Sequence, residues 1–306
     1  MSGPEVDTWP ALPYREWRAT RDTLHMYTQV LGKLRLALSP FEPQWANVAL
    51  YVTTRGLTTS PLPVGLRTVD AELDLLGHEL VLRSSAGHVE RQPLGAAVAD
   101  FYGDVMAALG RMNVDVAIST LPSEVDDPIP FPEDRTHDTY DPGQAERFFQ
   151  VLSMVTVVMA EHRARFRGRQ TPVQFFWGSF DLALMRFSGR PAEPRQGAGV
   201  IERFGGDAES ICAGWWPGDE RLPFPAFYTY AYPSPDGAAG MPVQPTIAGW
   251  NATAGEWLLE YEAVRRQPEP GAALRQFLDS TYSGAADLLG WDSGFTHVEA
   301  PALAGR

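Results

Sequence analysis

An aspartate interrupts an otherwise apolar segment, FFWGSFDLALMRFSGR, which runs from Phe175 to Arg190. The segment predicts one long strand with apolar side chains on both faces, as in the centre of a covered sheet. Ser179 and Asp181 then form a polar pair in the middle of it. A carboxylate in such a setting has a raised pKa and can transfer protons, or it stays ionised against a buried cation. Asp181 is therefore the first candidate for acid–base chemistry. The alternative is a structural ion pair with one of three arginines: Arg55, Arg35 or Arg190.

The first helix supplies two further candidates. Residues 16 to 38 have the 3.6-residue period of a helix that ends before a proline. Arg35 falls on the apolar face, where a guanidinium must find a carboxylate, backbone carbonyls or an anionic ligand, so we expect it to be buried. His25 lies at the boundary with the opposite, polar side, which carries Asp22, Gln29 and Lys33. It is the one histidine placed for acid–base work, with a helix-surface position as the alternative.

A polar row is predicted in the segment NVALYVTTRGLTT, residues 47 to 59. If this segment is one strand, Tyr51, Thr53 and Arg55 share a face. Such a row can be the hydrogen-bonding wall of a small-ligand pocket, in which Arg35 and Arg55 would hold an anion. An ordinary half-exposed strand is the alternative.

Large aromatic side chains are concentrated in two segments of the second half, AGWWPG and FPAFYTYAYP. Trp216 and Tyr228, together with Trp177, are candidates for the walls of a binding cleft, and core packing is the alternative. Glu209 lies in the same region and is assigned to substrate binding. Cys212 has Glu209 nearby but no histidine close in sequence, so it fits an inert buried cysteine better than a nucleophile.

Familiar cofactor and metal motifs are missing from the chain. It has no Gly-rich phosphate loop, no nucleophile elbow and no HExxH sequence. Residues 133 to 141 combine acidic side chains with a histidine, but a proline-rich acidic linker has the same composition. The single cysteine excludes a disulfide framework and a multi-cysteine metal site. We therefore expect no metal and no cofactor.

The elements that must position these residues follow from periodicity. Helices are predicted over residues 16–38, 96–112, 144–165 and 271–289. Strand-like runs are predicted over residues 47–59, 68–76, 78–84, 88–94, 114–120, 175–190, 209–216, 224–233 and 256–264. Runs of strands joined by short turns, with helices before and after them, predict an α+β fold with mostly antiparallel sheets.

The two halves of the chain have a similar order of elements. Residues 1–120 are predicted to form an α-β-β-β-α half, 121–143 a proline-rich acidic linker, and 144–306 a second α/β half packed with the first as one unit. The tripeptide QVL begins at both position 29 and position 150. Together these features favour an internal duplication.

Composition limits the classes of partner. A net charge of −13 over 306 residues argues against nucleic acid and against an anionic membrane surface. The start of the chain does not have the pattern of a secretory signal, and no apolar run reaches the roughly 18 residues that a membrane span needs. These features predict a soluble cytoplasmic protein with a small-molecule ligand. A homo-oligomer is compatible with the sequence.

Four segments carry a resemblance to a known family: TLHMYTQVLGKLRLAL, LYVTTRGLTTSPLP, FFWGSFDLALMRFSGR, and AGWWPG followed by FPAFYTYAYP. With them, nearly the whole chain resembles an uncharacterised bacterial family that is known only as a domain of unknown function. The resemblance implies no activity, cofactor or site. In that family a histidine often precedes the glutamate that corresponds to Glu209, whereas this chain has Ala208.

The sequence as a whole favours a metal-independent enzyme that acts by acid–base chemistry on a small polar or anionic metabolite in an aromatic-walled cleft. Asp181 and His25 would be catalytic. The substrate-binding residues would be Arg35, Tyr51, Arg55, Trp177, Ser179, Glu209, Trp216 and Tyr228. The alternative is a non-catalytic protein that binds a small ligand or a partner with the same residues.

Overall fold

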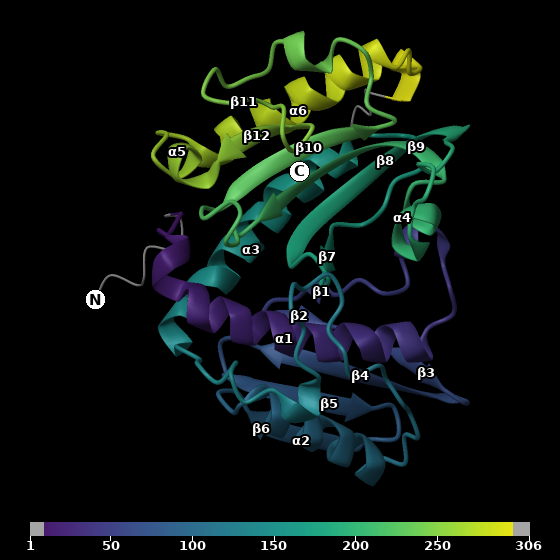
Figure 1. The fold of residues 1–306 in the computed structure, drawn as a ribbon, viewed down its shortest axis with the longest axis vertical. Coiled ribbons are helices and arrows are strands. Elements are labelled where there is room, and N and C mark those ends of the chain that lie inside the picture. The colour runs from purple at the N-terminus through teal and green to yellow at the C-terminus, as the bar shows by residue number, and fades with distance from the viewer. Residues whose placement is uncertain (1–8, 296–306) are drawn as a thin grey trace, which may run out of the picture. The chain divides into compact units, whose positions relative to one another are not determined.

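The computed structural model describes residues 9–295, which contain six α-helices and two antiparallel sheets of six strands each (Figure 1). The expected α+β class is thereby confirmed. The chain forms two compact units. The first comprises the residues up to Met154 together with Gln174–Leu182 and Trp216–Pro225; the second comprises Val155–Val173, Ala183–Trp215 and the residues from Ala226 on.

The first unit is built on a sheet with one apolar face. The strand order is β1 (Tyr51–Val52), β2 (Gly56–Thr58), β4 (Arg67–Asp74), β5 (Glu79–Ser84) and β6 (Val89–Pro93), and β3 (Leu62–Val64) also pairs with β4. Leu57, Leu73 and Leu80 lie in register across three neighbouring strands and are buried. Helix α2 (Val98–Arg111) covers this face. Gln92, which is in register with Leu80 and so lies on the same face, donates a hydrogen bond from Nε2 to Asp104 O of α2 at 2.7 Å.

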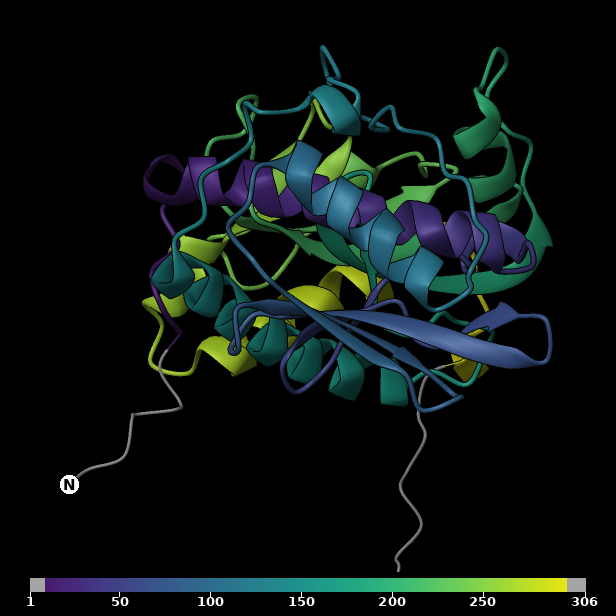
Figure 2. The same cartoon turned by 90° about the horizontal axis from the view of Figure 1, so that it is seen from below.

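Helix α1 (Tyr14–Leu38) lies beside α2 (Figure 2), and its central part is buried on all sides. Its Tyr27 ring stacks on Phe101 of α2, with centroids 3.9 Å apart. Its Trp17 ring stacks on Phe148 of α3 (Pro142–Ala164), with centroids 5.0 Å apart. Every residue from 20 to 35 except Asp22 is buried. The side of the helix that looked polar in sequence is therefore covered as well.

The segment from Phe175 to Arg190 is not one strand, so this prediction was wrong. Strand β7 (Gln174–Phe176) ends at a turn over residues 177–180, and β8 (Asp181–Pro191) begins after it. Asp181 is thus the first residue of a strand rather than the middle of one. The turn escapes detection because its side chains other than Ser179 are buried, so no polar run marks it.

Three other strand predictions also fail, wholly or in part. The predicted run 256–264 is a strand only to Glu260 and continues as a helix from Tyr261. The segment 47–59 forms the short strands β1 and β2, and Thr53 Oγ1 accepts hydrogen bonds from the backbone N–H groups of Arg55 and Gly56 in the turn between them, each at 3.0 Å. The proposed row of Tyr51, Thr53 and Arg55 on one strand face therefore does not exist. Residues 114–120 are irregular, because a strand forms only where a neighbouring strand offers backbone partners.

The second sheet has the strand order β11-β12-β10-β9-β8-β7. The members not yet described are β9 (Ala208–Trp216), β10 (Ala226–Tyr232), β11 (Gly249–Asn251) and β12 (Glu256–Glu260), and the accompanying helices are α4 (Val200–Gly205), α5 (Tyr261–Arg265) and α6 (Pro270–Leu288). In the second unit, Thr281 of α6 donates to Thr229 of β10 at 3.0 Å. Two sheets of six strands do not by themselves establish a duplication, which stays a prediction.

No helix within residues 9–295 is long and apolar enough to cross a membrane.

Gly32 of α1 offers a test of this packing. A Cβ placed there would lie 2.1 Å from the Trp177 ring, so Gly32→Ala forces the ring away. Although alanine favours a helix over glycine by about 1 kcal/mol, overpacking of this kind costs roughly 1–3 kcal/mol. We expect a lower free energy of unfolding, measured by urea denaturation.

Gly103 is the matched control. It is exposed within α2, and no atom lies within 4 Å of a Cβ built there. Gly103→Ala should leave stability unchanged or raise it by up to about 1 kcal/mol. If Gly32→Ala were as stable as Gly103→Ala, the packing of Trp177 on α1 described above would be wrong.

Candidate functional site

Four polar side chains lie along one face of α1 at steps of four residues: Arg21, His25, Gln29 and Lys33, here called the polar row. They are 8%, 6%, 0% and 4% exposed, respectively. Buried polar groups need hydrogen-bond partners, and those partners decide what surrounds the helix. In the first unit they come from two segments, the turn over residues 177–180 and the loop at residues 123–124.

His25 holds the turn. Its Nε2 lies 2.9 Å from Trp177 O, 3.0 Å from Gly178 O and 3.3 Å from Gln29 Nε2. The two nearest neighbours are carbonyl oxygens, which only accept, so we assign the hydrogen to Nε2. Burial, with a smaller contribution from the charge of Arg21, lowers the pKa of His25 to about 3. A neutral ring that donates to two carbonyls is suited to positioning the turn. A catalytic role for His25 stays a prediction.

Gln29 and Lys33 hold the loop. Gln29 Nε2 donates to Ser123 O at 2.7 Å, and Gln29 Oε1 accepts from Ser123 N at 3.0 Å. Lys33 Nζ donates to Ser123 Oγ at 3.0 Å and lies 5.5 Å from the centroid of the Trp177 ring. Burial lowers the pKa of Lys33. Three hydrogen bonds thus fix Ser123 against the helix, and with it the next residue, Glu124.

Glu124 and Asp181 are neighbouring acids, here called the carboxylate pair. Although Glu124 as a residue is exposed, its carboxyl group reaches the backbone of the turn, where a Cβ on Gly178 would lie 2.1 Å from Glu124 Oε1. Burial of this carboxyl group, together with the negative charge of Asp181, raises the pKa of Glu124. Asp181 is 6% exposed and accepts a hydrogen bond from the Ser179 hydroxyl. The two acids are therefore electrostatically coupled beside an exposed serine.

The backbone on both sides of this pair is strained. Glu124 has φ = 58° and Phe180 has φ = 60°, a region that side chains other than glycine rarely adopt. The buried Phe180 ring is held by the rings of Phe148 and Phe175, at centroid distances of 5.4 and 5.2 Å. Strain of this kind costs about 1–3 kcal/mol, persists only where the surroundings enforce it, and is concentrated at functional sites.

Arg35 is buried, as the helical phase predicted. Its Nε donates to Asn47 O at 2.9 Å, and its Nη1 donates to Thr59 O. Its guanidinium also lies 5.5 Å from the centroid of the Tyr51 ring, whose hydroxyl is 3.3 Å from Gln174 Nε2. Arg35 therefore joins α1 to Asn47, Thr59 and Tyr51, at the start of the first sheet.

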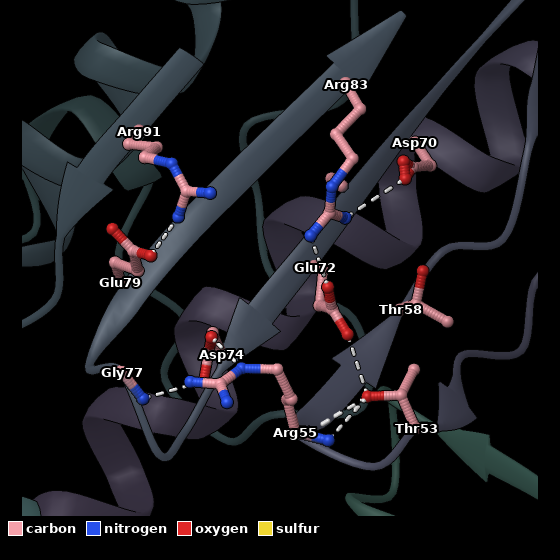
Figure 3. Close-up of polar contacts among 12 residues, drawn as sticks. Thr53, Arg55, Thr58, Asp70, Glu72, Asp74, Gly77, Glu79, Arg83 and Arg91 are labelled. Atoms are coloured by element: carbon pink, nitrogen blue, oxygen red, sulfur yellow. Dashed lines mark hydrogen bonds and ion pairs between the residues drawn. The ribbon is translucent and has the colours of Figure 1, made fainter. Parts of the chain in front are cut away.

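Arg55 belongs to a different network, on the polar face of the first sheet (Figure 3). It forms an ion pair with Asp74, whose Oδ1 also accepts from Gly77 N at 2.7 Å. On the same face, Glu72 accepts from Thr53 Oγ1 at 2.8 Å and from Arg83 Nη2 at 2.7 Å. These contacts bind the strands to one another and fix the turn between β4 and β5.

Trp177 and Trp216 occupy different surroundings. Trp177 is buried, and its Nε1 donates to Val48 O at 2.9 Å. Trp216 is half-buried at the start of the segment Trp216–Pro225. Two exposed ion pairs join that segment to α1 and to the loop that contains Glu124: Arg18 with Glu220, and Arg221 with Asp126.

Glu209 and Tyr228 lie in the second unit. Glu209 Oε1 accepts from Arg190 Nη2 at 2.5 Å and from Trp291 Nε1 at 2.6 Å. The half-buried Tyr228 stacks on Tyr230, with centroids 6.2 Å apart. The three arginines considered as partners of Asp181 thus make these contacts with other groups: Arg35 with carbonyls, Arg55 with Asp74, and Arg190 with Glu209.

Sequence reasoning placed His25, Trp177, Ser179 and Asp181 among the candidates, and the structure brings these four together. It missed Arg21, Gln29, Lys33 and Glu124. The four-residue spacing of the polar row was a usable signal, but its members were divided between faces: Gln29 and Lys33 were placed on the polar side of the helix, His25 at the boundary and Arg21 at the edge of the apolar face. Glu124 carried no signal, because it stands in a segment with the composition of an acidic linker.

The acidic segment after residue 130 is structural. Asp134 is fully buried and accepts from His137 Nδ1 at 2.7 Å and from the backbone N–H groups of Thr136 and His137, each at 3.1 Å. Over the described part of the chain, no group of three or more His, Cys, Asp or Glu side chains could hold a metal ion.

Comparison with protein families identifies one match: a model described as a family of unknown function, DUF5996, matches residues 9–297. A search of curated proteins and a search of solved structures each found no match.

The lowered pKa of His25 predicts an acid-sensitive fold. Between the unfolded value of 6.5 and the folded value of about 3, the unfolded chain binds a proton that the folded chain does not. The free energy of unfolding should therefore fall as pH decreases through this range, by about 1.4 kcal/mol per pH unit for this one group. His25→Gln should remove that part of the slope, measured by urea unfolding between pH 6 and pH 4.

His162, whose pKa is lowered to about 4, contributes to the same slope, so the comparison is between variants. His88→Gln, at an exposed position, is the control and should keep the slope of the native protein. An unchanged slope in His25→Gln would show that His25 is not buried as a neutral ring.

The raised pKa of Glu124 predicts the opposite dependence. Above its folded pKa, ionised Glu124 destabilises the fold, because it is partly desolvated and repelled by Asp181. Glu124→Gln should therefore raise the melting temperature at pH 7.5. The gain should shrink as pH falls below the unfolded pKa, where the carboxyl group is protonated in both states.

The control is Glu133→Gln, the same chemical change at an exposed position. It should leave the melting temperature nearly unchanged both at pH 7.5 and at a pH below the unfolded pKa of glutamate. A lower melting temperature for Glu124→Gln at pH 7.5 would mean that its carboxylate makes a stabilising contact instead.

Proposed function

The chain belongs to the DUF5996 family of unknown function, and from the site itself we propose that it is a metal-independent enzyme that acts by acid–base chemistry on a small polar metabolite. The observation that carries the proposal is the position of the Glu124 carboxyl group against the backbone of Gly178, three residues before Asp181, whose negative charge acts on it. Two nearby carboxylates with different environments are the usual means of keeping an acid and a base side by side at one pH.

The roles follow from the surroundings of each acid. Glu124, whose pKa is raised, keeps its proton to higher pH and is the general acid. Asp181, oriented by the Ser179 hydroxyl, is the general base. In one turnover, Asp181 would accept a proton from the substrate and Glu124 would deliver one to it. The protons then return to their starting positions by exchange with solvent.

Access and rigidity also support this proposal. Glu124 and Ser179 are exposed residues, so a metabolite can approach them from solvent, and the buried Asp181 is joined to Ser179 by a hydrogen bond. The polar row fixes both segments to α1 through five hydrogen bonds to Ser123, Trp177 and Gly178. A pair held on both sides by one rigid helix is preorganised for catalysis.

Several of the binding residues expected from the sequence have no role in this proposal. Arg35 and Arg55 are engaged with backbone carbonyls and with Asp74, so a role in holding an anion is not favoured for them. The aromatic wall is reduced to Trp216, whose segment is held beside α1 and the loop that contains Asp126. Glu209 and Tyr228 are left out of this site.

The second candidate function is a non-catalytic protein that binds a small ligand. One observation favours it: His25 and Gln29 are both occupied in holding backbone groups. The carboxylate pair would then recognise a hydroxyl or amino group without transferring a proton.

The two functions are separated by a screen of metabolites for thermal stabilisation, followed by mass spectrometry of each hit after incubation. For an enzyme, Glu124→Gln and Asp181→Asn should each slow conversion by about 100-fold or more, the usual contribution of a general acid or base. Glu133→Gln should convert the same metabolite at the native rate.

Gly178→Ala is an additional variant that keeps both acids. Its Cβ would displace the Glu124 carboxyl group, which is the end of a flexible side chain, so conversion should fall while the fold persists. A metabolite that binds in a Glu124-dependent way but is recovered unchanged supports the binding protein. Equal conversion by the native protein, Glu124→Gln and Asp181→Asn would refute acid–base catalysis by this pair.

A further inference from the structure

Arg21 is the member of the polar row that has not yet been given a role. It stands one turn before His25 on α1, and the residue is 8% exposed. Its guanidinium carbon lies 5.3 Å from the centroid of the ring of Phe180, which is the residue between Ser179 and Asp181. Arg21 is therefore a buried cation next to the turn that carries the proposed base.

One edge of this guanidinium is unsatisfied. Nη1 donates to Asp22 Oδ1 at 2.8 Å. Nε is buried and has no hydrogen-bond partner, and no hydrogen bond within residues 9–295 uses Nη2. Leaving a buried donor unpaired is costly, so native proteins rarely do so without a reason. The Nε–Nη2 edge is also the one that forms two parallel hydrogen bonds with a planar oxyanion.

Two other buried arginines show what a structural role looks like in this protein. Arg35 uses both Nε and Nη1 on backbone carbonyls. Arg186 also has an unpaired Nε, but its guanidinium carbon lies 4.3 and 5.0 Å from the centroids of Tyr282 and Phe166, and its Nη2 donates to His162 O at 2.5 Å. Arg21 has one neutralising neighbour on its own helix and one ring contact, with Phe180 of the turn that leads into Asp181.

We propose that the Nε–Nη2 edge of Arg21 binds an oxyanion, a carboxylate or a phosphate, of the metabolite on which Glu124 and Asp181 act. The identity of this ligand as a substrate rests on the proposed function, whereas the binding of an oxyanion does not. The ligand class is then a small molecule with an anionic group at Arg21 and a proton-exchanging group at the acids. An anion needs such a cation, because the two carboxylates repel it.

The test uses acetate and inorganic phosphate as probes, each against chloride at matched ionic strength, on the full chain. Melting temperatures are measured for the native protein, Arg21→Gln, Arg21→Lys and Arg15→Gln. Arg15 is exposed on the same helix, so Arg15→Gln removes the same charge without touching the site. General salt effects on stability act on all variants alike, so only differences between variants count.

We expect acetate or phosphate to raise the melting temperature of the native protein and of Arg15→Gln, and not that of Arg21→Gln. Arg21→Lys keeps the charge but not the planar edge, so it should also lose most of the shift. A response to acetate alone indicates a ligand with a carboxylate group, and a response to phosphate alone indicates a ligand with a phosphate group. Either response supports the proposal.

Two outcomes would overturn it. One is no shift beyond that in chloride for the native protein, and the other is an equal shift in Arg21→Gln or Arg21→Lys. If Arg21→Gln does not fold, Arg21→Lys and the native protein still decide the matter. The shift should persist in Glu124→Gln, so a failure of oxyanion binding at Arg21 is distinguished from a failure of acid–base catalysis.

Discussion

The burial of the central part of α1 on all sides is the constraint on which the rest of the first unit depends. Once a helix is covered on every face, its polar side chains can no longer be satisfied by water and must take partners from neighbouring segments. Here the partners are mostly backbone groups: the carbonyls of Trp177 and Gly178 in the turn, and the carbonyl and N–H groups of Ser123. Side chains of the helix thus replace the strand neighbours that these irregular segments lack.

The same constraint explains how two acids come to lie close together in segments far apart in sequence. The turn and the loop are each fixed to α1, and each contains one residue with positive φ, Phe180 and Glu124. Such conformations are unfavourable in isolation and are stable here because the aromatic cluster around Phe180 and the hydrogen bonds to Ser123 hold them. The favourable free energy of these core contacts thus offsets the cost of placing two like charges near each other.

The sequence predicted the parts of this structure that have a local signal. The four long helices, the strands β4 to β6 and the burial of Arg35 follow from periodicity and from the cost of an unpaired cation. The turn before Asp181 had one local signal, the pair Gly178 and Ser179. That signal was outweighed by the apolar residues around it, and the conformation of the turn also depends on Phe180 packing against residues of other elements. The role of Glu124 could not be predicted, since it depends on contacts that only the folded chain creates. The polar row was visible, but whether a helix is covered on one side or two is a property of the fold.

The missing side chain at Gly178 has a consequence for the comparison of relatives. Because the Glu124 carboxyl group occupies the space that a Cβ at position 178 would need, the two positions are sterically exclusive: a larger residue at one requires a shorter or displaced residue at the other. Family members can therefore be sorted by this pair alone. Those with glycine at the position of Gly178 and glutamate at that of Glu124 have room for the carboxylate pair. Members with a side chain at the first position cannot hold a glutamate carboxyl group in the place it occupies here, even if the fold is the same.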